Sequence, residues 1–178
     1  QNQTRRVFLK KSTEVAAATA ALTTLGGIHT EAQTSQSKLG IGIIGCGGIM
    51  THHVSGLVGR KESVEITHLC DVDTAQINRM AKKVTKGFQS APPKATQRYE
   101  DVINDKNVDG VIIATPHHWH APIALAAMEA GKDVYIEKPI SHVYNEGHEI
   151  IKAAKKYGRI VQQGSQMRNS AVTLKAEK

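Results

Sequence analysis

From Leu39 onward, short apolar runs alternate with longer stretches in which apolar residues recur every three or four positions. Short apolar runs are typical of buried strands, and the amphipathic stretches are typical of helices that cover a sheet. The apolar runs predict strands at 39–44, 64–70, 95–98, 108–114, 133–137 and 160–163. The amphipathic stretches predict helices at 48–59, 74–85, 99–104, 119–130 and 143–157.

The helix expected at 74–85 has an apolar stripe on one face, formed by Ile77, Met80, Ala81 and Val84. Asp73 and Gln76 have the spacing of a capping box, and Gly131 and Gly158 stand where C-terminal caps are expected. Alternating strands and helices with right-handed crossovers predict an α/β fold. We expect a doubly wound parallel sheet of the Rossmann type, with strand order 3-2-1-4-5-6.

Composition narrows the classes of function. The chain has 178 residues, 40% of them hydrophobic, which is enough for a real core. Its net charge of +7 is scattered, and with only 4% aromatic residues nothing interleaves to stack bases, so we expect no nucleic-acid partner. Cys46 and Cys70 show no metal-ligand spacing and are interpreted as free thiols, although they could approach each other across adjacent strands.

The amino end has the pattern of an export signal. Residues 4–11 read TRRVFLKK and precede a weakly apolar run at 15–28 and a small-residue site at 30–32. This pattern resembles a twin-arginine signal, which implies export to the periplasm by the twin-arginine (Tat) machinery. The apolar run is too short for a stable membrane span. The alternative, an amphipathic first helix, fits less well because the run has no polar face.

The sequence GCGGIM (45–50) follows the first expected strand. Gly45 and Gly47 fit the first two glycines of the dinucleotide-binding pattern Gly-x-Gly-x-x-Gly, but Met50 replaces the third. We expect a tight turn at Gly45, a pyrophosphate against the main chain at Gly47, Gly48 and Ile49, and a following helix displaced slightly by Met50. Alone, this motif is a weak signal.

Asp71 follows the second expected strand, about 20 residues beyond the turn, where an acidic residue typically binds the adenosine ribose. Its carboxylate would repel a 2′-phosphate, which favours NAD over NADP. Asp73 is the competing candidate, but the capping box already explains it. The alternative reading of Asp71 is an ordinary turn residue.

Two more loops end strands at the same carboxyl edge of the sheet: ATPHHWHAP (114–122) and YIEKPIS (135–141). Together with the glycine turn, they resemble the sugar-oxidoreductase family named after glucose-fructose oxidoreductase, inositol dehydrogenase and the rhizopine protein MocA. The resemblance spans about 39–168, and Glu-Lys-Pro is its most specific element. It implies that NAD lies against the first loop, at Thr115, Pro116, Trp119 and His120.

The resemblance also implies a catalytic lysine, Lys138, near the substrate hydroxyl and the nicotinamide, with Glu137 beside the cofactor and a cis bond before Pro139. An ammonium group there stabilises negative charge on the oxygen as hydride leaves its carbon, and burial can tune its pKa. GSQMRNS (164–170) resembles a further family segment, so Gln166, as a cofactor-binding residue, and Arg168 are expected to border the site.

His117 stands where the family's variant has an aspartate, so its role is open. A zinc site formed by His117, His118 and His120 is an alternative, but no carboxylate or cysteine joins them at a ligand spacing, and we expect no metal.

Family members continue into a second, substrate-binding domain that supplies an acid-base histidine. We therefore expect a signal at 1–32, an NAD-binding domain at 33–165, and the start of a truncated second domain at 166–178. The predicted function is an exported NAD-dependent oxidoreductase for a sugar, polyol or glycoside, homo-oligomeric when full length. The alternatives are an NAD-dependent glycosidase of the same fold and a non-catalytic nucleotide-binding fragment.

Overall fold

The structure is a computed structural model that describes residues 38–165. Residues 38–165 lie within a single compact unit. The predicted export signal (1–32), Gln166 and Arg168 lie outside the described residues. Within residues 38–165, no helix is both long and apolar enough to cross a bilayer.

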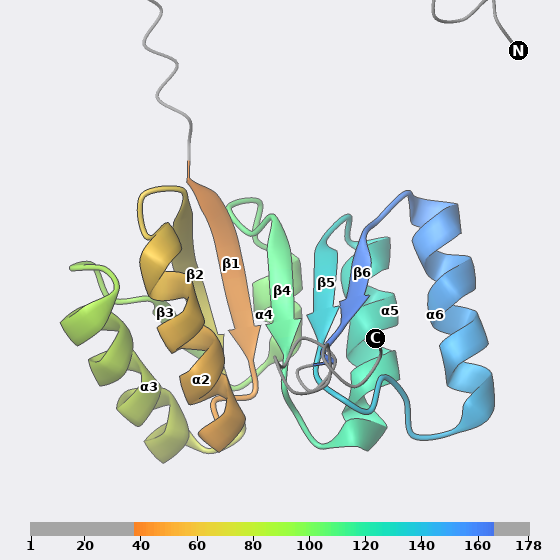
Figure 1. Cartoon of the computed structure of the whole chain (residues 1–178), viewed down its shortest axis with the longest axis horizontal. Coiled ribbons are helices and arrows are strands. Elements are labelled where there is room, and N and C mark those ends of the chain that lie inside the picture. The colour runs from red at the N-terminus through yellow and green to blue at the C-terminus, as the bar shows by residue number, and fades with distance from the viewer. Residues whose placement is uncertain (1–37, 166–178) are drawn as a thin grey trace, which may run out of the picture. The chain divides into compact units, whose positions relative to one another are not determined.

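Six parallel strands form one sheet in the order β3-β2-β1-β4-β5-β6, which confirms the predicted topology (Figure 1). The chain adds β2 and β3 on one side of β1, and then adds β4, β5 and β6 on the other side. The boundary between β1 and β4 is the switch point at which doubly wound sheets bind ligands. The strands are β1 (Leu39–Ile44), β2 (Val64–Cys70), β3 (Lys94–Thr96), β4 (Gly110–Ile113), β5 (Asp133–Ile136) and β6 (Val161–Gln163).

The helices connect these strands close to their predicted positions. They are α2 (Gly48–Leu57), α3 (Thr74–Gly87), α4 (Tyr99–Ile103), α5 (His120–Glu129) and α6 (Tyr144–Tyr157), with 3₁₀ turns η1 (Val58–Arg60) and η2 (His117–Trp119). The helix expected to start at Trp119 is preceded by η2, and β4 is shorter than the expected 108–114.

The core consists of two clusters, one on each face of the sheet. Ile43 belongs to the cluster under α2 and α3, and the next residue, Ile44, belongs to the cluster under α4, α5 and α6. Successive strand residues point to opposite faces, so a strand covered by helices on both sides is apolar throughout. Figure 1 shows α2 and α3 in front of β1 to β3, with α4 and α5 behind the sheet.

Capping explains where two helices begin and end. Asp73 caps α3 by accepting the Ala75 N–H at 2.8 Å, as predicted. The second half of the expected capping box is absent, because Gln76 Oε1 is buried without a hydrogen-bond partner among the described residues. Gly158 ends α6 in the left-handed conformation, as predicted, and Gly131, just past α5, also has a positive φ.

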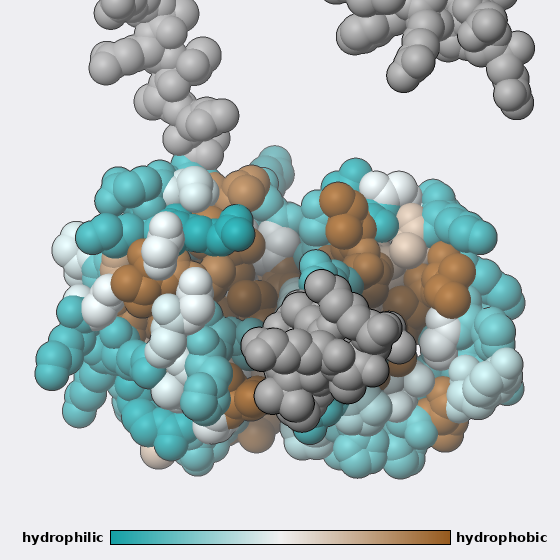
Figure 2. All heavy atoms as spheres, viewed as in Figure 1, coloured by the Kyte–Doolittle hydropathy of each residue, from teal (hydrophilic) through white to brown (hydrophobic). Residues whose placement is uncertain are grey.

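The surface agrees with this layering. In Figure 2, hydrophilic side chains dominate the periphery of this face, and hydrophobic side chains appear in smaller groups further in. All six strands point their carboxyl ends toward the lower edge in Figure 1, where the glycine turn and the two loops singled out from the sequence lie.

Candidate functional site at the carboxyl edge of the sheet

The glycine turn requires its first glycine. Gly45 has a φ of 91°, and a Cβ at this position would lie 2.6 Å from the Ala114 carbonyl oxygen at the end of the neighbouring strand. Only glycine satisfies both the left-handed backbone and the close approach. The predicted tight turn at Gly45 is therefore confirmed.

The next two glycines of the turn, Gly47 and Gly48, face open space. A Cβ at Gly47 or Gly48 would meet nothing within 4 Å, and Ile49 is exposed. Gly47 is the N-cap of α2 and offers no side chain to the free N–H groups of the first turn, which has no acidic residue. Those N–H groups and the helix dipole are arranged for an anion.

Met50 does not obstruct this space. Its side chain is fully buried in the cluster between α2 and the sheet, together with Ile43 and Val54. The thioether fills core volume beneath the helix, where the third glycine of the pattern would allow closer packing.

Asp71 is held against the glycine turn. One carboxylate oxygen accepts the Cys46 N–H at 2.7 Å, and the other accepts the Asp73 N–H at 2.9 Å. Each oxygen can accept a second hydrogen bond, so the carboxylate is oriented and still able to bind a ribose hydroxyl. Since Asp73 caps α3, the two carboxylates have separate tasks.

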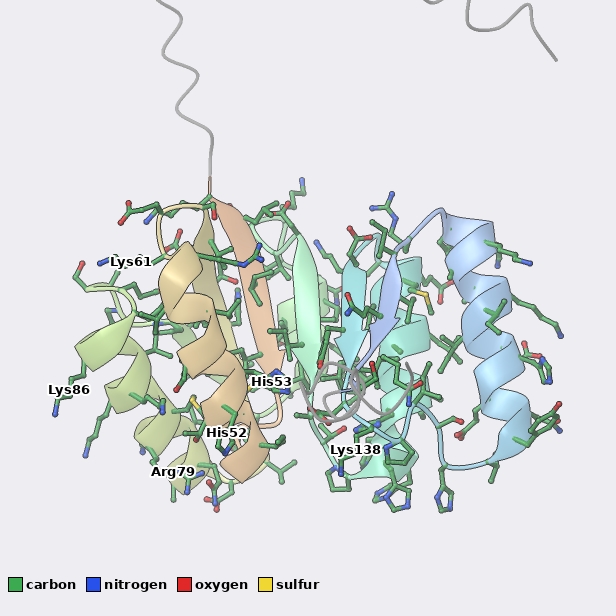
Figure 3. The ribbon with its side chains drawn as sticks, in the orientation of Figure 1. His52, His53, Lys61, Arg79, Lys86 and Lys138 are labelled. Carbon is green, nitrogen blue, oxygen red and sulfur yellow. The ribbon has the colours of Figure 1, made fainter. Side chains whose placement is uncertain are left out.

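Arg79 was not predicted as a site residue. From α3 (Figure 3), its guanidinium donates a hydrogen bond of 3.2 Å to the carbonyl oxygen of Cys46, the residue whose N–H the Asp71 carboxylate accepts. A guanidinium has five N–H donors, and this contact uses one of them. The contact joins segments 33 residues apart, and no spacing in the sequence indicated it.

Thr115 follows β4 and has a buried hydroxyl without a hydrogen-bond partner among the described residues. An orphaned hydroxyl in a protein interior is uncommon and typically marks a ligand or water contact. Pro116 then leads into η2, and Trp119 at its end is 46% exposed. These residues form the wall of the site next to the glycine turn.

His120, the first residue of α5, joins two of the site's loops. Its Nε2 lies 2.9 Å from the Thr115 carbonyl oxygen, and its Nδ1 lies 2.7 Å from the Pro139 carbonyl oxygen. The ring is almost completely buried, and both of its nitrogens contact main-chain acceptors. Within the described residues, His120 thus connects the loop after β4 to the loop after β5. Its predicted contact with NAD stays a prediction.

Lys138 follows β5 at the same edge of the sheet (Figure 3). The bond to Pro139 is cis, as the resemblance implied. The side chain is exposed, so the described residues do not bury the ammonium group, contrary to our sequence interpretation.

Glu137, expected beside the cofactor, lies next to Lys138 and contacts His53, which was not predicted as a site residue; the cofactor contact of Glu137 stays a prediction. His53, on α2, contacts Glu137 with 2.7 Å between Nε2 and Oε1, and the Glu137 carboxylate also accepts the Lys138 N–H at 2.9 Å. Tyr135 packs edge-on against the His53 ring, and burial, aided by the Glu137 charge, raises the pKa of its phenol.

Burial makes the thiols of Cys46 and Cys70 unreactive. Both are buried free thiols, as predicted, and burial raises the pKa of each to about 12. The nearby Asp71 carboxylate raises both values further. Neither thiol is a nucleophile at neutral pH.

The zinc alternative gains no support among residues 38–165, which contain no group of His, Cys, Asp and Glu side chains suited to a metal ion. His117 contacts His142 in a tilted arrangement with 4.8 Å between ring centres, and both ring nitrogens of His120 contact carbonyl oxygens.

A groove of about 530 Å³ lies at the opposite, amino-terminal edge of the sheet. Its polar groups are engaged with one another: Asp109 accepts the Gly40 N–H, and the Asp105 carboxylate lies 2.6 Å from the Lys94 ammonium and 3.4 Å from the His68 ring. Among the described residues, this groove lacks the orphaned hydroxyl and the free helix N–H groups that mark the carboxyl edge.

The residues at the carboxyl edge fit a dinucleotide. The glycine turn leaves room for a pyrophosphate at Gly47, Asp71 is oriented for a ribose, and the Thr115 hydroxyl lacks a partner within the described part of the chain. The three features lie at the ends of β1, β2 and β4, on both sides of the switch point.

Comparison with known proteins agrees with this geometry. The family model described as the oxidoreductase family with an NAD-binding Rossmann fold matches residues 39–165. Glycosyl hydrolase family 109 protein 2 of Shewanella sp. strain ANA-3 is 33% identical over 171 residues, which cover 85% of this chain and 37% of that protein. The α-N-acetylgalactosaminidase of Shewanella oneidensis is 33% identical over 119 residues, covering 65% of this chain and 26% of that protein.

Solved structures of two dehydrogenases also resemble this chain. The WlbA dehydrogenase of Chromobacterium violaceum, crystallised with NADH and UDP-GlcNAcA, has a TM-score of 0.71 and 26% identity, covering 79% of this chain and 39% of that one. Myo-inositol 2-dehydrogenase of Lactobacillus plantarum has a TM-score of 0.66 and 27% identity, covering 79% and 40%. The chain spans 37% of the length of the curated relatives that it matches over most of its own length. It belongs to the Gfo/Idh/MocA oxidoreductase family, of which it carries the NAD-binding Rossmann domain.

Proposed function

We propose that the protein is an NAD-dependent oxidoreductase that transfers hydride between a carbinol carbon of a sugar, polyol or glycoside and the nicotinamide. One observation carries this proposal: the oriented Asp71 carboxylate, the open glycine turn at Gly47 and the Lys138 side chain share one edge of the sheet. Asp71 and the loop that bears Lys138 follow β2 and β5, so a dinucleotide held at Asp71 and directed across the switch point would be held by residues on both sides of it.

Each residue has a separate task in this proposal. The N–H groups at the start of α2 bind the pyrophosphate, Asp71 binds the adenosine ribose, and the Thr115 hydroxyl binds the part of the dinucleotide near β4. Bound NAD supplies the hydride acceptor or donor. Lys138 directs its ammonium group at the substrate oxygen and stabilises the negative charge that develops there as the carbon is oxidised.

The substrate class rests on the names of the relatives. The WlbA dehydrogenase was crystallised with a nucleotide sugar, and the Lactobacillus plantarum relative is an inositol dehydrogenase. Sugars and polyols offer the secondary alcohol that hydride transfer requires. The acid-base group that takes the hydroxyl proton is assigned to a part of the protein other than residues 38–165.

A second candidate function has support of its own. Relatives that match up to 85% of the chain are named as glycosyl hydrolase family 109 proteins, and one is named as an α-N-acetylgalactosaminidase. In an NAD-dependent glycosidase, a sugar carbon is oxidised, the aglycone is eliminated, water adds, and the hydride returns to the sugar. The same positions of Asp71 and Lys138 serve either reaction.

We also propose that the protein is exported by the twin-arginine route, on the basis of the TRRVFLKK segment and the apolar run that follows it. That route carries folded proteins, so the NAD would be inserted before export and held tightly. Fusing residues 1–37 to a reporter and locating it in cells with and without Tat components tests this proposal. A reporter that stays in the cytoplasm of both strains contradicts it.

One experiment separates the functions. The full-length protein is incubated with an aryl glycoside, without added NAD, while phenol release and sugar oxidation are followed. Phenol release identifies the glycosidase, and oxidised sugar without phenol identifies the oxidoreductase. A protein that binds NAD and gives neither product with a panel of sugars, polyols and glycosides supports a non-catalytic nucleotide-binding module.

A further inference from the structure

His53 and Glu137 meet although 84 residues separate them in the sequence. His53 lies in the helix that the glycine turn opens, one helical turn after Ile49, and Glu137 directly follows β5. The pair therefore joins the element that begins at the cofactor turn to the loop that carries Lys138. Figure 3 shows His53 and Lys138 on the two sides of the switch point.

Both oxygens of Glu137 have a defined partner in this arrangement. Oε1 lies 2.7 Å from His53 Nε2, and Oε2 accepts the main-chain N–H of Lys138 at 2.9 Å. Glu137 is only 3% exposed, and a buried carboxylate without hydrogen bonds is costly. An ionised carboxylate can only accept, so His53 donates its Nε2 proton. A hydrogen bond to a charged group contributes more than a neutral one.

Packing restricts the pair further. The Tyr135 ring contacts the His53 ring edge-on with 5.1 Å between centres. A Cβ at Gly164, beyond β6, would lie 2.8 Å from the Tyr135 hydroxyl and 3.4 Å from Glu137 Oε1. A side chain at position 164 would therefore crowd both residues, and the contact with His53 is one of the interactions that orient the Glu137 carboxylate.

We propose that His53 is a positioning residue for Lys138: by fixing the Glu137 carboxylate, it fixes the main chain from which the lysine side chain extends toward the substrate. This inference rests on the proposed role of Lys138 in hydride transfer. His53 itself touches neither substrate nor cofactor in this assignment. It links α2, whose first turn binds the cofactor in this proposal, to the loop that carries Lys138. The position of the lysine relative to the dinucleotide is thereby fixed.

The neighbouring residue provides a matched control. His52 is also a histidine on α2, but its side chain is exposed and takes part in none of the contacts described here (Figure 3). His52→Ala and His53→Ala therefore remove the same group from the same helix. Only the second removes the contact between residue 53 and Glu137. His53→Gln is the conservative variant, because its amide can donate to Oε1 at a similar reach.

The test uses the full-length protein and its preferred alcohol substrate, with NAD affinity, kcat and KM measured for each variant. We expect His53→Ala to lower kcat about 10- to 100-fold, the cost of a misplaced catalytic group, with NAD affinity and substrate KM within about 3-fold of wild type. His53→Gln should recover most of kcat, and His52→Ala should match wild type.

Amide hydrogen exchange gives a readout that does not depend on activity. In the His53→Ala variant the Lys138 amide should exchange about 10-fold or more faster than in wild type, because its acceptor, Glu137, loses the contact with residue 53. The amides of β1 and β4 should exchange at wild-type rates in the same variant. Faster exchange throughout the sheet would show a general loss of stability and overturn the proposal.

The outcomes also separate this inference from the proposed function. If Lys138→Ala abolishes turnover but His53→Ala keeps wild-type kcat and Lys138 exchange, the positioning role is wrong and the proposed function stands. If Lys138→Ala keeps full turnover, the proposed role of the lysine fails first. A kcat in His53→Gln as low as that in His53→Ala would also contradict positioning through the hydrogen bond.

Discussion

The Asp71 carboxylate accepts the Cys46 N–H at 2.7 Å, so the end of β2 is fastened to the middle of the glycine turn. A second N–H, from Asp73, fixes the other carboxylate oxygen. The acidic side chain is thus oriented before any nucleotide arrives. Preorganisation of this kind lowers the entropic cost of binding a ribose.

Replacing Asp71 should change the choice of cofactor. We expect Asp71→Ala to weaken NAD binding roughly 10- to 100-fold, the value of one or two hydrogen bonds to a charged group. NADP binding should fall much less, because its 2′-phosphate loses a repelling charge and Arg79 lies nearby. Titration calorimetry with both nucleotides measures the two changes, and equal losses would argue against the ribose contact.

Alanine substitutions at the first two glycines of the turn should have different effects, one on stability and the other on NAD binding. Gly45→Ala places a Cβ against the Ala114 carbonyl group at positive φ, and we expect a loss of about 2 kcal/mol or more in unfolding free energy. Gly47→Ala meets no atom within 4 Å, so it should keep wild-type stability and lose NAD affinity. Denaturant unfolding and nucleotide titration of both variants check this contrast. A stable Gly45→Ala protein would refute our account of the turn.

Lys138 should affect chemistry more than binding. The side chain is exposed at the edge of the site, so Lys138→Ala removes no packing. We expect wild-type NAD affinity and a kcat lowered by about 100-fold or more in the full-length protein, since a preorganised charge at the reacting oxygen is lost. Steady-state kinetics beside nucleotide titration provide the measurement. Unchanged turnover would exclude the lysine from the reaction.

The cysteines predict an alkaline limit to stability. Burial raises the pKa of Cys46 from 9.0 to about 12, so the folded protein holds a neutral thiol where the unfolded chain ionises. A raised pKa contributes stability below pH 9.0 that is lost as the pH rises toward about 12. Cys46→Ala should flatten this loss in pH-dependent unfolding. A thiol that reacts readily with Ellman's reagent at pH 8 would contradict the burial.

The sequence predicted the fold well because its signals are local. Apolar runs and glycine caps mark each element, and right-handed crossovers then determine the strand order. Errors occurred at element ends: β3 begins at Lys94, before the expected 95–98, and η2 precedes α5. At such ends, hydrogen bonds from neighbouring segments decide the conformation, and sequence periodicity does not report them.

The site was predicted only in part, for a related reason. Gly45 and Asp71 belong to a motif with fixed spacing, so they could be located in the chain. The contacts of His53 with Glu137 and of Arg79 with Cys46 join distant segments, and no spacing rule connects them. His53 could have been suspected, because it follows Ile49 by one helical turn and so shares the face of α2 nearest the glycine turn.

Amide chemical shifts during NAD titration test the central claim most directly, because they report where on the sheet the dinucleotide binds. The account predicts the largest shifts at the carboxyl edge, in Gly47, Gly48, Ile49 and Thr115, with the amino-terminal groove around Gly40 and His68 unaffected. Shifts confined to that groove, or none at saturating NAD, would contradict it.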